Sequence, residues 1–111
     1  MWPFKKKPVI HPQDRMSYIV SEGNLKGTFV LFFDLYPKGE VYYALAIGED
    51  PSAYGGMRIL EIPTSAVIEA FKHGILDSAG IIPSDKWEIL HSEYIKRMEM
   101  YDLSGKNDKD D

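Results

Sequence analysis

Short runs of aromatic and β-branched residues alternate with glycine- and proline-containing turns over the first sixty residues of the chain. This pattern predicts β-strands at about residues 17–22, 28–35, 41–48 and 57–62. The turns between the first three runs are short, so neighbouring strands can pair only antiparallel. We therefore expect a four-stranded antiparallel meander.

The turn "PKG" sets a register for the second and third strands, because a three-residue loop places Tyr36 opposite Glu40. On one face every resulting pair is large and apolar, as expected of a core face. These pairs are Leu35 with Val41, Phe33 with Tyr43, Leu31 with Leu45, and Phe29 with Ile47. The other face pairs Asp34 with Tyr42, Phe32 with Ala44, and Val30 with Ala46.

The second face is apolar in its middle, at Phe32, Ala44 and Ala46. One interpretation is that another part of the chain covers it. The alternative is that a partner or a second copy of the chain docks there, because exposed apolar patches mark interaction sites. A homodimer through these three residues is therefore one hypothesis.

Two helices are expected after the strands, at about residues 65–73 and 85–102. The second helix carries an apolar stripe with the spacing of one helix face, while Ile89 and Met100 fall outside it. The stripe consists of Trp87, Leu90, Tyr94, Met98 and Tyr101. Residues 75–84 are expected to be an irregular connection. The fold class is thus α+β, with both C-terminal helices packed on one face of the meander.

The length of 111 residues fits one domain, expected at residues 16–103. Residues 1–15 contain three prolines and are expected to be irregular, and residues 104–111 form an acidic tail expected to be disordered. The chain has no cysteine, which excludes disulfides, thiol catalysis and thiolate metal sites. No apolar run is long enough for a membrane span, and the start lacks the apolar region of a secretory signal, so we expect a cytoplasmic protein.

The charge distribution is informative about partners. Residues 8–101 carry eight basic and thirteen acidic side chains, a net charge of −5. An acidic body repels phosphate backbones, so nucleic acid is not an expected partner. The same charge favours a basic protein partner, although acidity also serves solubility alone.

Catalytic and ligand-binding motifs are absent from the sequence: there is no phosphate-binding glycine loop, nucleophile elbow, zinc-protease helix or calcium loop. The spacing of His11, His73 and His91 does not match a metal site on one element, so neither a metal nor a cofactor is expected. Asp34, Glu61 and His91 are the candidate titrating groups of an enzyme. The alternative interpretation is structural: Asp34 and Glu61 are solvated acids, and His91 is a histidine on the face of a helix.

Acidic and tyrosine residues gather around the third strand, a combination suited to gripping a basic protein. The candidate partner-binding residues are Asp34, Tyr36, Glu40, Tyr42, Glu49, Asp50, Tyr54 and Glu61. Tyr43 belongs to the core face, whereas Tyr36, Tyr42 and Tyr54 are expected to be exposed. In the loop "EDPSAYGG", turn formation accounts for Pro51 and the glycines but not for Tyr54.

Three functional hypotheses follow. The first is a non-catalytic protein that binds and neutralises a basic partner, as toxin-immunity proteins and nuclease inhibitors do. The second is a small enzyme or ligand-binding domain with a pocket between sheet and helices. The third is a homo-oligomeric structural domain joined through Phe32, Ala44 and Ala46.

Overall fold

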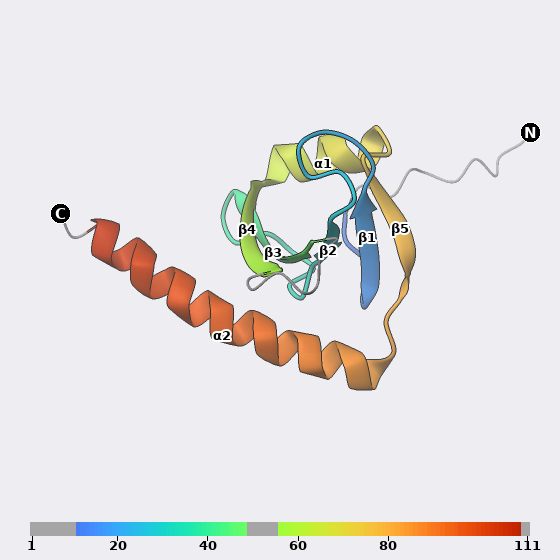
Figure 1. The fold of residues 1–111 in the computed structure, drawn as a ribbon. Helices are drawn as coiled ribbons and strands as arrows, with labels where there is room; N and C mark the ends of the chain where they lie inside the picture. Colours follow the sequence, from blue (N-terminus) through green and yellow to red (C-terminus); the bar gives the residue numbers. More distant parts are fainter. Residues whose placement is uncertain (1–10, 49–55, 110–111) are drawn as a thin grey trace, which may run out of the picture.

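A computed structural model describes residues 11–48 and 56–109 of the chain, with side chains described as far as residue 101. One five-stranded antiparallel sheet has the strand order β4-β3-β2-β1-β5 (Figure 1). The elements, in chain order, are β1 (Met16–Val20), β2 (Phe29–Leu31), β3 (Val41–Ile47), β4 (Met57–Pro63), α1 (Thr64–Lys72), β5 (Leu76–Ile81) and α2 (Ser84–Lys109). The predicted α+β class is confirmed.

The two helices lie on opposite faces of the sheet, which corrects the prediction that both pack on one face (Figure 1). The strand order explains this arrangement. β4 and β5 are the two edge strands, so the chain between them must cross one face, and α1 covers that face. The opposite face would be left bare without α2, which packs its apolar stripe there.

The fifth strand was not expected. The segment of β5, "LDSAGI", lacks the β-branched and aromatic composition that predicts a strand, yet it pairs with β1 from Met16↔Ile81 to Val20↔Leu76. The boundaries of two other elements also differ from prediction. β2 is shorter, ending at Leu31, and α2 is longer, continuing to Lys109 within the segment expected to be disordered.

The register of the β2–β3 pair is as predicted over the strand that forms. Phe29 pairs with Ile47, Val30 with Ala46, and Leu31 with Leu45. The predicted pairs beyond Leu31 lie outside β2, because the backbone leaves the ladder there.

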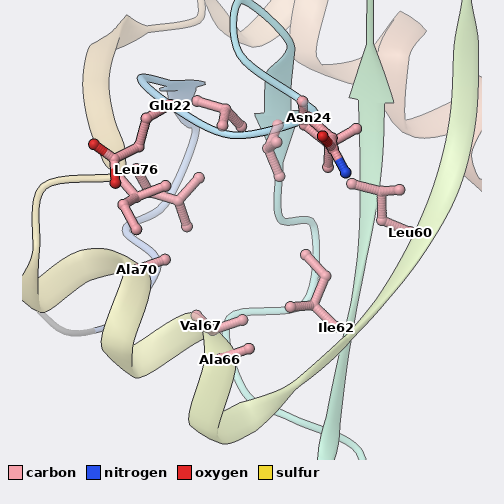
Figure 2. A pocket seen from close by; sticks show the side chains of 12 residues that line it. Glu22, Asn24, Leu60, Ile62, Ala66, Val67, Ala70 and Leu76 are labelled. Atoms are coloured by element: carbon pink, nitrogen blue, oxygen red, sulfur yellow. The ribbon is translucent and has the colours of Figure 1, made fainter.

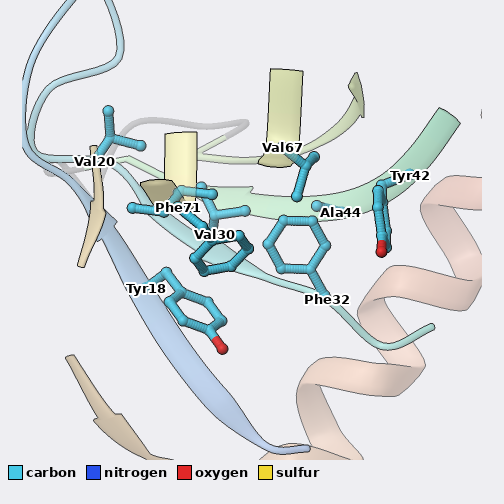
Figure 3. Packing of buried hydrophobic residues seen from close by; sticks show 9 residues of the cluster. Tyr18, Val20, Val30, Phe32, Tyr42, Ala44, Val67 and Phe71 are labelled. Carbon is cyan, nitrogen blue, oxygen red and sulfur yellow. The ribbon is translucent and has the colours of Figure 1, made fainter. Parts of the chain in front are cut away.

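The face beneath α1 contains a dense aromatic core (Figure 3). Tyr18 packs edge-to-face against both Phe32 and Phe71, with ring centroids 6.0 and 5.0 Å apart. Val67, on α1, is fully buried against the same cluster. The chain thus covers its own second sheet face.

This packing decides between the two interpretations of the second face. Phe32, Ala44 and Ala46 are each at most 1% exposed. They therefore offer no surface to a second copy, and the hypothesis of an oligomer joined through these residues is wrong.

The face beneath α2 is a second, separate core around Leu31, Leu45 and Tyr94. The predicted stripe of α2 supplies Trp87, Leu90 and Met98 to it. Ile89 and Met100, the two residues outside the stripe, are exposed as expected. The helical periodicity thus identified the buried face of α2 correctly.

A bulge interrupts the pairing of the edge strand β5 with β1. Ser17 pairs with Gly80 and Tyr18 with Ser78, so Ala79 has no opposite residue. Gly80 has φ +119°, a conformation that suits glycine, and its carbonyl accepts a hydrogen bond from Ser17 Oγ at 2.8 Å. Bulges of this kind twist an edge strand and disfavour its pairing with another sheet.

Tyr18 links this core to the segment before β1, because its hydroxyl oxygen accepts a hydrogen bond from the backbone N–H of Gln13 at 2.8 Å. Burial raises the pKa of Tyr18 above its ordinary value, and the Gln13 bond offsets only part of that rise. A tyrosine with a raised folded-state pKa stabilises the fold below its unfolded pKa, and this contribution is lost as pH rises through the folded value.

We expect Tyr18→Phe to lower the free energy of unfolding by about 1 kcal/mol at pH 7, because the Gln13 N–H loses its acceptor. The variant should also lose less stability than the wild type between about pH 10 and pH 12. Urea unfolding across this pH range measures both effects. Tyr36→Phe, at an exposed tyrosine, is the control and should change neither. An unchanged alkaline slope in Tyr18→Phe would contradict the assignment.

Candidate partner-binding surface

The segment that joins β2 to β3 is anchored on both sides of the sheet. Phe32 points into the α1-side core, whereas Phe33 packs against α2. The Phe33 ring lies 4.3 Å from the Trp87 ring and 5.1 Å from the His91 ring, measured between centroids. Two consecutive aromatic residues thus hold the backbone from which residues 34–40 project.

Tyr36 is the most exposed of the large hydrophobic residues that the structure describes, at 81%. The turn after it is closed by paired backbone bonds between Lys38 and Val41, and Gly39 adopts a positive φ of 65°. Glu40 is exposed as well, and its carbonyl accepts a hydrogen bond from the Thr64 N–H at 2.8 Å. The structure therefore presents Tyr36 and Glu40 on an anchored segment. Tyr36 is exposed as predicted.

Asp34 lies at the start of the same segment and has two partners. Its Oδ2 accepts a hydrogen bond from Tyr94 OH at 3.3 Å and lies 3.9 Å from Lys38 Nζ. The Lys38 pair is solvent-exposed, so it contributes little stability and can be rearranged at low cost. None of the described residues forms an ion pair with Glu40.

Tyr42 was predicted to be exposed and to bind a partner. This prediction is wrong, because only 5% of the residue is exposed. Its ring packs edge-to-face on Phe32, with centroids 5.6 Å apart. Burial raises the pKa of Tyr42, and the neighbouring Tyr36 raises it further. Tyr42 is part of the α1-side core, so it is unavailable to a partner. The sequence placed it on the correct face of the strand, but it could not show that α1 covers that face.

Glu61 lies apart from the β2–β3 segment. It is on edge strand β4, opposite Tyr43, and its Oε1 accepts a hydrogen bond from Tyr101 OH on α2. Its carboxylate therefore helps to fix α2 on the sheet. The remaining predicted residues, Glu49, Asp50 and Tyr54, lie outside the described residues.

The candidate titrating groups of an enzyme are engaged in structural contacts. His91 stacks on Phe33, and Asp34 and Glu61 accept the tyrosine bonds described above. His73 Nε2 lies 3.2 Å from Glu69 Oε1 at the end of α1, and His11 Nδ1 lies 3.1 Å from the carbonyl of Pro12. Within residues 11–48 and 56–109, no group of three or more acidic or histidine side chains is placed to hold a metal ion.

A pocket lies between α1 and the sheet, under the loop that follows β1 (Figure 2). Its volume is about 400 Å³, and ten of its twelve lining residues are apolar. None of His91, Asp34 or Glu61 lines it. The sequence suggested a pocket between sheet and helices as one alternative, but it contained no signal for this position.

Comparisons with protein-family models, curated proteins and solved structures find no match for this chain. In the part of the chain that the structure describes, no helix has the length and apolar character needed to cross a membrane.

Proposed function

We propose that this protein is a non-catalytic binding protein that engages a basic protein partner through Asp34, Tyr36 and Glu40. The observation that carries the proposal is the 81% exposure of Tyr36 beside acidic residues on a segment anchored in both cores. Neutralisation of the partner, in the manner of a toxin-immunity protein or nuclease inhibitor, is the role we assign to it.

Two physical effects favour binding at this surface: little conformational entropy is lost on binding, and the acidic charge attracts a basic partner. A tyrosine offers a large amphipathic contact area with few rotatable bonds, and it is enriched among the residues that dominate interfaces. The backbone beneath Tyr36 is already held by Phe32 and Phe33, so binding orders little additional structure. The net charge of −4 and the unpaired Glu40 would steer a basic partner toward this surface.

The first experiment is a pull-down from the native host with the full chain as bait, at low and at high salt. We expect one basic protein to be retained at low salt and released in part at high salt, because charge steering is screened. Recovery of no partner, or of a partner with salt-independent binding, would count against the proposal.

The second experiment tests the surface itself. We expect Tyr36→Ala to weaken binding of the captured partner by about 30-fold or more, corresponding to about 2 kcal/mol. Glu40→Lys should slow association, most strongly at low salt. Both variants should keep the stability of the wild type within about 0.5 kcal/mol, because the changed side chains are exposed. Calorimetry and stopped-flow kinetics measure these effects.

A matched control variant is Glu88→Lys. It makes the same charge change at an exposed position on α2, outside the β2–β3 segment. If Glu88→Lys slowed association as much as Glu40→Lys, the net charge and not this surface would be responsible for binding.

A further inference from the structure

The pocket beneath α1 is lined by α1, by strands β1, β2, β4 and β5, and by the loop that follows β1. α1 contributes Ala66, Val67 and Ala70, whose side chains point toward Leu60 and Ile62 of β4 (Figure 2). The two alanines are one helical turn apart, and their small size leaves the space open. Val20, Val30, Ile75 and Leu76 complete the apolar wall, together with Leu25 from the loop.

The loop above the pocket is fixed by hydrogen bonds, so the pocket is formed before any ligand binds. Ser21 donates its N–H to the Ile75 carbonyl at 2.8 Å and its hydroxyl to the Gly74 carbonyl at 2.9 Å. Within the loop, Thr28 N–H donates to Leu25 and Gly27 N–H to Val20, at 2.9 and 2.8 Å. These bonds hold the loop against the start of β5 on one side and β1 on the other.

The chemistry of the lining selects an aliphatic ligand. About 400 Å³ lies within the range of small-molecule sites, and an apolar wall gives water few partners. None of the lining residues that the structure describes is aromatic, so among them a flat ring would have no partner for stacking. A flexible alkyl chain would fill the space and remove the apolar wall from contact with water.

The polar groups lie at the rim. Glu22 and Asn24, both on the loop, are the two polar residues of the lining (Figure 2). Glu22 is a carboxylate, and none of the described residues that line the pocket is basic. A ligand whose alkyl chain occupies the pocket would therefore be attracted to the Glu22 carboxylate if its head group is positively charged. An anionic head group would be repelled.

We propose that this pocket binds a small aliphatic amine, with its chain against Val67, Leu60 and Ile62 and its ammonium group at Glu22. This inference is independent of the proposed protein partner, because none of the residues of the β2–β3 surface lines the pocket.

The test uses the full chain and three probes that share one chain length: decylamine, decanol and decanoate, each below its micelle concentration. Isothermal titration calorimetry should show saturable one-to-one binding, strongest for decylamine and weakest for decanoate. Absence of saturable decylamine binding would overturn the proposal. Decanoate binding as tight as that of decylamine would also overturn it.

Two variants test separately the contacts made by the alkyl chain of the ligand and those made by its ammonium group. Ala70→Leu fills the pocket and should weaken all three probes by about tenfold or more. Glu22→Gln should weaken decylamine by about two- to fivefold and leave decanol unchanged, because it removes only an exposed charge contact. If Glu22→Gln weakened decanol as much as decylamine, the assignment of the head group would be wrong.

Ala79→Leu is the matched control, since it makes the same change at the exposed bulge of β5, outside the pocket. It should leave binding of all three probes unchanged, and an equal loss in both variants would overturn the proposal. If Ala70→Leu unfolds, Ala66→Leu replaces it, because Ala66 lines the pocket at an exposed position.

Discussion

Phe32→Ala is expected to lower the free energy of unfolding by about 3–5 kcal/mol. The ring is 1% exposed and packs against Tyr18, Tyr42 and Phe71, so its removal leaves a cavity that these neighbours cannot fill. Urea unfolding followed by fluorescence or circular dichroism measures the change. The effect would be a large part of the stability of a small domain.

The same variant also tests the oligomer hypothesis that the structure rejects. If the face of Phe32 were a docking surface, Phe32→Ala would change the oligomeric state and leave the stability of each chain nearly intact. Light scattering alongside the unfolding experiment separates the two outcomes. Phe29→Ala is a useful comparison, because Phe29 is 38% exposed and should cost less stability.

Removal of α2 should have the largest effect. A chain that ends at Pro83 loses Trp87, Leu90, Tyr94 and Met98 and exposes the sheet face that they cover. Tyr94 is buried and the other three side chains are partly buried, so together they contribute roughly 4–8 kcal/mol, a large part of the total stability of a domain. We therefore expect the shortened chain to lose cooperative thermal unfolding and its near-ultraviolet circular dichroism.

A second truncation controls for the loss of chain length. A chain that ends at Tyr101 keeps the whole apolar stripe and the Tyr101–Glu61 hydrogen bond. It should unfold cooperatively, with a midpoint close to that of the full chain. If both truncations behaved alike, the stability assigned to the α2-side core would be wrong.

The hydrophobic periodicity of the sequence correctly predicted those features of the fold that depend on residues close together in the chain. The register of Phe29 with Ile47 followed from a turn and from period-two alternation, and the buried face of α2 followed from the helical period. β5 was missed because its residues are small or polar and gain their strand conformation only from pairing with β1. The prediction of helices on one face failed because it assumed that the sheet ends at β1.

The candidate binding surface was also predicted only in part from the sequence. The position of Tyr36 in a short turn was enough to predict its exposure. Tyr42 was misjudged because alternation indicates which residues share a face but not what covers that face. The pocket under α1 depends on the space between α1, β1, β2 and the loop between these two strands, which are distant from α1 in sequence and meet it only in the folded sheet.

The position of β1 between β2 and β5 has a consequence for synthesis of the protein. As the chain leaves the ribosome, β1 can pair with β2 early, but its other edge has no partner until residues 76–81 emerge. Until then both faces of the nascent meander are apolar and uncovered, because α1 and α2 follow later in the chain. Pairings between segments so distant in sequence form slowly and leave the unfinished sheet prone to association. We therefore infer that nascent chains stalled before β5 depend on chaperones, and that productive folding begins only once β5 and α2 have emerged.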